Sequence, residues 1–200
     1  MNSVLKKLSA KQAKSMIRKI NKFDDTIEYN ENHTQILVWD MPFASNAVFI
    51  ECADYSIMPH CNKNYLEIDK SIKKVVYTDN PYNDNNLQTL DLHLDKDNIA
   101  YYLRFYMDLF QNKMGVLTPV HSHNDINLQE DISPSLLNIL STEFQNYPII
   151  ESKNTDFSVK LICVFKQALF EVTFDVSAQG QVIIGDRKIL LNDLPIKNLS

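Results

Sequence analysis

Apolar and polar residues alternate most regularly toward the C-terminal end of the chain, with the period of two that is typical of a β-strand. Two such runs, 159–165 and 170–176, are joined by the short segment 166–168, and a third apolar run follows at 182–184. Turn-forming residues at 178–180 precede this third run. The pattern predicts an antiparallel meander with one buried face.

Shorter strand patterns occupy the N-terminal half. Apolar positions at 27–29 and 36–39 flank the polar run 30–33, which predicts a hairpin turn. The segment 78–86 consists almost entirely of turn-forming residues and predicts a long exposed loop. Further strands are expected at 48–50, 73–78 and 90–95.

Two later segments have the apolar spacing of helices. The first spans about 97–113, with Asp97 as its N-terminal cap and Gly115 in position to end it in the left-handed conformation. Its aromatic and leucine positions form a wide apolar stripe, so we expect it to be the most buried helix. The second begins at Ser133-Pro134, where serine can cap and proline fits the first turn.

The first 23 residues predict a basic amphipathic helix. Ser9 and Gln12 fit a capping box, and apolar residues recur at helical spacing from Ala10 to Ile20. Seven of the 20 basic residues lie in this segment, whereas the remainder has 13 basic residues and all 25 acidic ones. The helix therefore has two expected uses, packing on its own acidic body or binding a partner, with these candidate contacts: Lys11, Lys14, Arg18, Lys19 and Lys22.

Together these elements predict an α+β fold, a mainly antiparallel sheet packed by two or three helices. The length of 200 residues suits a single domain over 1–200, with 1–23 as its basic N-terminal helix. One sheet or two contiguous sheets would both fit the pattern. No run of apolar residues approaches the roughly 18 needed to cross a membrane. The three cysteines, without a CxxC pair or a signal-peptide core, favour a cytoplasmic location.

Two clusters of potential metal ligands stand out. Asp91 and His93 alternate with leucines and, with Asp95, would share one face of a strand. The motif His121-Ser122-His123-Asn124-Asp125 follows a short apolar run, and its alternate imidazoles could bind one transition metal. It resembles the opening of the metallo-β-lactamase metal motif, but Ile126 replaces that family's next histidine and no histidine follows. Ordinary solvated polar residues and a loop cap remain the alternative, and no cofactor is otherwise predicted.

Other features of the sequence argue against a thiol nucleophile, nucleotide-dependent catalysis and nucleic-acid binding. The neighbours His60 and Cys61 suggest a thiol nucleophile, but adjacent residues on a strand point to opposite faces. Only three glycines occur, and no phosphate-binding loop is present, which argues against nucleotide-dependent catalysis. The basic helix lacks aromatic side chains for stacking on bases, which disfavours nucleic acid as its partner.

Two segments carry a resemblance to a known group of proteins. These are the aromatic helix at 101–106 running into Gly115-Val116-Leu117, and the strand Ala168-Leu169-Phe170-Glu171-Val172-Thr173-Phe174. They resemble a set of small uncharacterised bacterial proteins over about half of the chain. The resemblance implies a bacterial origin and no activity, so no catalytic residue is carried over.

Three functional hypotheses follow. The first is a non-catalytic interaction or accessory protein that binds another macromolecule, most plausibly a protein. The second is a small-ligand-binding domain with a pocket where the aromatic helix crosses the sheet. The third is a metal-dependent hydrolase with a His-x-His site built on His93, His121 and His123.

Overall fold

The computed structural model describes residues 5–6, 8–56, 61–75, 77, 85–109 and 117–197. The chain divides into an N-terminal unit, Asn2–Val76 with Asn83–His93, and a C-terminal unit, Tyr77–Tyr82 with Leu94–Ser200. Each unit has its own five-stranded sheet, and every strand pairing is antiparallel. The predicted α+β class with mainly antiparallel sheets is confirmed. The assignment of 1–200 to a single domain stays a prediction.

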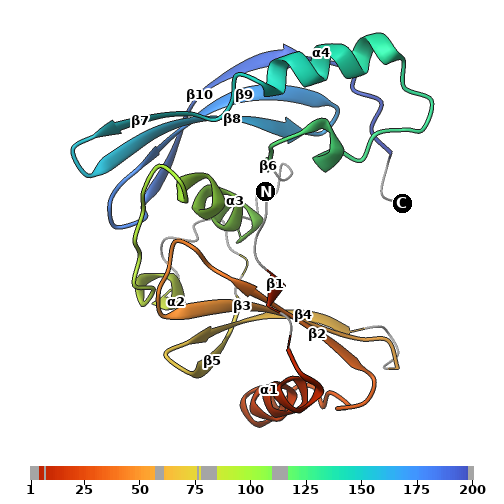
Figure 1. Ribbon diagram of the computed structural model, residues 1–200, viewed down its shortest axis with the longest axis vertical. Coiled ribbons are helices and arrows are strands. Elements are labelled where there is room, and N and C mark those ends of the chain that lie inside the picture. The colour runs from red at the N-terminus through yellow and green to blue at the C-terminus, as the bar shows by residue number, and fades with distance from the viewer. Residues whose placement is uncertain are drawn as a thin grey trace. The chain divides into compact units, whose positions relative to one another are not determined.

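The sheet of the N-terminal unit is a meander in which each strand pairs with the next along the chain (Figure 1). Sequence order and spatial order therefore coincide, although a helix lies between β1 and β2 in the chain. The strands are β1 (Leu5–Lys6), β2 (Thr34–Asp40), β3 (Ala47–Asp54), β4 (Cys61–Ile68) and β5 (Ser71–Lys74).

Helix α1 (Ala10–Phe23) packs against one face of this sheet (Figure 1). Ser9 caps the helix, and the predicted capping box with Gln12 is present. Ile17 and Ile20 are 1% and 0% exposed and belong to a core cluster with strand residues such as Ile50. Burying each isoleucine contributes about 1.5 to 3 kcal/mol. The helix therefore docks on its own unit, which is one of the two uses expected of it.

The sheet of the C-terminal unit has the order β10-β9-β8-β6, and β7 pairs with β8 as well. The predicted meander is confirmed in its three long strands, and Gly180, with φ of 82°, provides the left-handed residue of the β9–β10 turn. The strands are β6 (Thr118–Val120), β7 (Ile149–Lys153), β8 (Asp156–Phe165), β9 (Ala168–Val176) and β10 (Val182–Leu191).

Both faces of this sheet are covered, so the expectation of a single buried face is wrong. Val159, Val172 and Phe174 are fully buried on one face, whereas Ile162 and Leu169 are fully buried on the other. Ile162 and Leu169 pack with Leu140 and Phe144 of α4 (Pro134–Phe144), the helix predicted from Ser133-Pro134. A strand that is covered on both faces has apolar residues at successive positions, so apolar and polar residues no longer alternate along it.

Helix α3 (Ile99–Leu109) belongs to the same unit and lies on the opposite side of the sheet from α4 (Figure 1). The hydroxyl of Tyr102 donates to the carbonyl of Gly180, which fixes the helix to the β9–β10 turn. Its buried residues confirm the expected wide apolar stripe, whereas the predicted extension to 113 and the cap at Gly115 lie outside the described residues. Asp95, and not Asp97, accepts the first backbone N–H groups, those of Asp97 and Asn98.

Two predicted strands are absent from the described residues. Residues 27–29 form no strand, although 31–33 form a turn before β2. Segment 90–95 follows the short helix α2 (Asn85–Gln88) and pairs only through an isolated bridge between Leu92 and Ala44. The N–H groups of Asp91 and His93 donate to the Asn46 side chain and the Phe43 carbonyl. Loop groups thus take the hydrogen bonds that a neighbouring strand would have taken.

The predicted strand at 73–78 is present as β5, which begins at Ser71 and ends at Lys74. Most of the predicted loop at 78–86 lies outside the described residues. None of the helices in the described part of the chain combines the length and the apolar character required to cross a membrane.

Candidate functional site

The first metal candidates, Asp91 and His93, lie in the N-terminal unit beside Ser45. Ser45 Oγ donates to Asp91 Oδ2 at 2.6 Å, and His93 Nε2 lies 3.3 Å from Ser45 Oγ and 3.4 Å from Asp91 Oδ2. The hydrogen bond from Ser45 lowers the pKa of Asp91, although the side chains of Asp91 and His93 are both largely exposed.

This trio has the residue types of a hydrolase triad but not its geometry. In a triad the imidazole contacts serine with one nitrogen and the carboxylate with the other. Here the same nitrogen of His93 faces both groups, and the hydroxyl proton of Ser45 is directed at Asp91. The contacts tie the end of the 90–93 segment to the loop at Ser45, which is a structural role.

The second set of metal candidates, His121, His123 and Asp125, lies in the C-terminal unit. Residues His123–Asp125 form one turn of 3₁₀-helix directly after β6. Asp125 accepts hydrogen bonds from the backbone N–H groups of His121 and Ser122 at 2.9 and 3.1 Å. The carboxylate of Asp125 therefore caps a loop, as the alternative reading of the motif expected.

No group of three or more potential metal ligands occurs within the described ranges, and Asp95 is used to cap α3. The prediction that Asp91, His93 and Asp95 share a strand face is wrong, because 90–95 is not a strand. His60 lies outside the described residues, as does the side chain of Cys61. Binding of a transition metal stays a prediction.

His121 is the candidate with the most unusual surroundings. Burial lowers the pKa of His121, and the positive charge of Arg104 lowers it further, while the negative charge of Asp125 acts in the opposite direction. Its Nε2 atom is buried and has no hydrogen-bond partner among the described residues. A neutral imidazole is the form that such surroundings favour.

Replacing His121 by phenylalanine is expected to make the protein less sensitive to acid. Because the folded-state pKa lies below the ordinary value of about 6.5, the unfolded chain takes up the proton first, and stability is lost as the pH falls through that window. Melting temperatures of wild type and His121→Phe, measured between about pH 7.5 and 5.5, should show the smaller fall in the variant. Identical pH dependence would contradict a neutral His121.

Three of the five basic candidates on α1 bind residues of their own unit. Their contacts cross from the helix to the loop before β2 and to β4, so they add to the docking of the helix. Lys11 and Lys22 form no ion pair within the described part of the chain. Partner binding by the basic helix stays a prediction. The three pairs are Lys14 with Asn32, Arg18 with Glu31 and Lys19 with Glu67, at shortest distances of 2.9, 2.6 and 2.7 Å.

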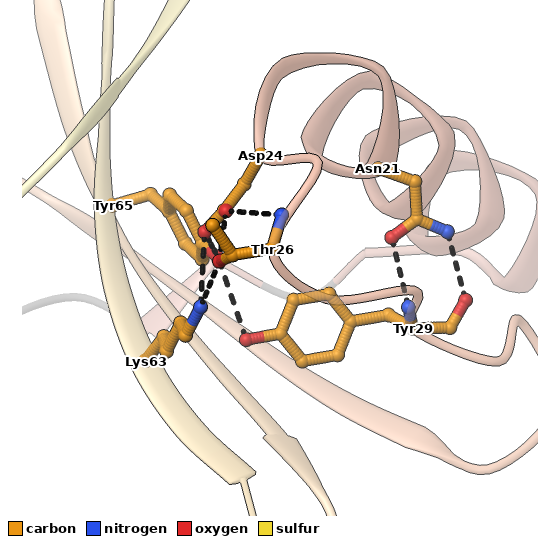
Figure 2. A network of polar contacts seen from close by, with 6 residues as sticks. All are labelled: Asn21, Asp24, Thr26, Tyr29, Lys63 and Tyr65. Atoms are coloured by element: carbon orange, nitrogen blue, oxygen red, sulfur yellow. Dashed lines mark hydrogen bonds and ion pairs between the residues drawn. The ribbon is translucent and has the colours of Figure 1, made fainter.

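A buried polar network fixes the chain where it leaves α1 (Figure 2). Asp24 is 5% exposed and accepts hydrogen bonds from Thr26, from Lys63 at 3.2 Å and from the Tyr65 hydroxyl at 2.8 Å. Burial alone would raise the pKa of Asp24, but the hydrogen bonds from Thr26, Tyr65 and Lys63 outweigh it and hold the pKa well below its ordinary value. The carboxylate is therefore ionised, and each of its partners is a donor that stabilises the charge.

The side chain of Asn21 extends the same anchor. Its amide donates to the carbonyl of Tyr29 at 2.8 Å, and its oxygen accepts from the Tyr29 N–H at 2.9 Å (Figure 2). Nearby, Asp54 is fully buried, which alone would raise its pKa, but the hydrogen bonds that it accepts from Ser56 and Thr34 outweigh burial and lower the pKa to about 2. The polar groups of these networks hydrogen-bond to one another, which stabilises the fold where the chain leaves α1.

The exposed edge of the C-terminal sheet is formed by β10, a strand of 10 residues. Ser177 N–H donates to the Gln181 carbonyl at 2.9 Å, which sets the alternation of the β9–β10 ladder. In an antiparallel ladder, hydrogen-bonded residue pairs alternate with pairs that exchange no hydrogen bond. Val182 and Ile184 belong to the second kind, so their N–H and C=O groups point away from β9. In the described part of the chain no strand pairs with this side of β10.

Two large apolar side chains are exposed on this edge strand. Ile183 is 60% exposed and Ile189 is 55% exposed. A register shift between Ile184 and Arg187 inserts one extra residue, so Ile183 and Ile189 lie on opposite faces of the sheet. Sequence reasoning identified the strand but not its exposed edge, since the position of a strand within a sheet depends on the topology.

A hollow of about 360 Å³ adjoins the C-terminal end of β10. The Nζ atom of Lys166 lies 5.4 Å from the centre of the Phe165 ring, which places a cation beside the hollow. The residues that line it come from the β8–β9 turn and from the chain after β10: Phe165, Lys166, Gln167, Ala168, Phe170, Asn192 and Asp193.

Comparisons with known proteins were made at three levels. No family model, no curated protein and no solved structure matches this chain. The resemblance to small bacterial proteins stays a prediction.

Proposed function

We propose that this protein is a non-catalytic interaction protein that binds a protein partner by adding an extended segment of that partner to β10. The observation that carries the proposal is the edge of this 10-residue strand, with which no other strand of the described residues pairs. Unpaired N–H and C=O groups in a row are a template for another strand, and main-chain hydrogen bonds supply the affinity in such complexes.

The side chains of β10 favour pairing with particular partner strands over pairing with any exposed strand. Exposed Ile183 and Ile189 offer a partner strand one apolar contact on each face of the sheet edge. Between them, the extra residue and the charged run 186–188 interrupt the edge. Bulges and charges of this kind limit pairing with unrelated strands, so a partner must match two short stretches.

A random peptide library displayed on phage and selected against the full-length protein tests this proposal. The selected peptides are expected to have the alternating pattern of a strand, because each must place side chains on two faces of the extended sheet. Hydrogen exchange read by mass spectrometry should show that bound peptide protects residues 182–191. Ile183→Lys, which places a charge on the edge, should weaken binding with little change in melting temperature.

The selection has two outcomes that would overturn the proposal. One is the absence of any enriched peptide. The other is a set of enriched peptides that protect a segment elsewhere and bind wild type and Ile183→Lys equally. Binding at α1, for example, would return the function to the basic residues of that helix.

A further inference from the structure

The hollow beside β10 shares a face with one of the exposed isoleucines. Ile189 pairs directly with Phe170, and Phe170 lines the hollow. Directly paired residues of neighbouring strands place their side chains on the same face, in contact with each other. The apolar side chain of Ile189 on the edge strand is therefore next to a residue that lines the hollow.

Charge around this surface is mainly positive. Arg187 lies two residues before Ile189 and therefore shares its face. Lys166 lies over Phe165 at the hollow, and neither Lys166 nor Arg187 has an ion pair within the described residues. Asp193 is the one acidic residue that lines the hollow. An apolar group with an acidic neighbour would complement this arrangement.

We infer that the hollow is the side-chain pocket of the proposed binding edge. It takes an apolar side chain of the partner strand, and Lys166 and Arg187 attract acidic side chains that flank it. The partner is thus an extended protein segment with an apolar residue between acidic ones. This inference rests on the proposed function, because the edge of β10 brings the segment to the hollow.

Fluorescein-labelled strand peptides provide the test, with binding to the full-length protein measured by anisotropy. The probe has a central phenylalanine between two glutamates, and matched peptides replace both glutamates by lysine or the phenylalanine by alanine. The glutamate peptide is expected to bind at least about tenfold more tightly than either of these. A fourth peptide with N-methylated backbone amides cannot pair with β10 and should not bind.

Two charge-removing variants locate the site. Lys166→Asn removes the cation, and asparagine tolerates the φ of 53° found at this position. It should weaken binding of the glutamate peptide by about threefold to fivefold, the range of an exposed ion pair. Lys188→Gln is the control, because Lys188 pairs with Glu171 on the opposite face and should have no effect.

The outcomes separate the two proposals. Equal binding of the glutamate and lysine peptides, equal effects of the two variants, or no binding of the phenylalanine probe would overturn the assignment of the hollow. If the N-methylated peptide binds as well as its parent, pairing with β10 is overturned as well. Loss of binding on N-methylation alone, with no dependence on Lys166, would retain the edge and reject the pocket.

Discussion

Asp24→Ala is expected to lower the unfolding free energy of the N-terminal unit by about 3 kcal/mol. The substitution removes the buried carboxylate that accepts from the Lys63 ammonium and from the Tyr65 hydroxyl. Tyr65 is fully buried whereas the Lys63 side chain is 25% exposed, so the expected cost lies at the lower end of the range for breaking a buried ion pair. The single tryptophan, Trp39, lies in β2, so urea unfolding followed by its fluorescence reports this unit.

The neighbouring acid provides a matched control. Asp25 is exposed, and Asp25→Ala should change the unfolding free energy by less than about 0.5 kcal/mol. Similar urea midpoints for the two variants would show that the Asp24 network contributes little to stability. In wild type the contribution of Asp24 is present at neutral pH and is lost only in acid, as the pH falls through its lowered pKa.

Leu140→Ala is expected to destabilise the C-terminal unit by about 3 to 5 kcal/mol. Leu140 is fully buried in the cluster with Ile162 and Leu169, so truncation removes apolar contacts and leaves a cavity. Thermal unfolding followed by far-ultraviolet circular dichroism measures the effect, because the single tryptophan of the chain lies in the N-terminal unit and does not report on this one.

The preceding residue on α4 is the control for this substitution. Ile139 is 47% exposed, and Ile139→Ala should lower the melting temperature only slightly. If Leu140→Ala were equally mild, α4 would not be packed on the second face of the sheet. The comparison therefore tests the finding that both faces of β8 and β9 are covered.

The elements with strong local signals were predictable from sequence. Helix α1 has both a capping box and an apolar stripe, β8 and β9 have alternation, and β10 begins with an apolar run after a clear turn. Local hydrogen bonding and the period of the apolar residues determine the secondary structure of such segments. Segment 90–95 has the same alternation, but Asn46 and Phe43 take its backbone hydrogen bonds, and these partners lie about 45 residues away.

The proposed binding surface was the least predictable part. Whether β10 lies at the edge or inside the sheet depends on where the chain goes after Leu191, and no periodicity carries that information. The Asp24 network is equally hidden, because Lys63 and Tyr65 come from another strand. Potential ligands such as Asp91 and Asp125 were found as residue types, but their hydrogen bonds are those of loop caps. Residue type alone therefore predicts too many metal-binding or catalytic residues in loops.

Strand β8 pairs with β9 along one side, and along the other side with β7 at one end and β6 at the other. Its hairpins with β7 and β9 are local, whereas the β6 pairing joins residues that are about 45 positions apart. Closing that longer loop costs more chain entropy, so the contacts between β6 and β8 form later during folding. The folding of this unit therefore has a natural order, in which a core of three or four strands forms around β8 and β6 completes it.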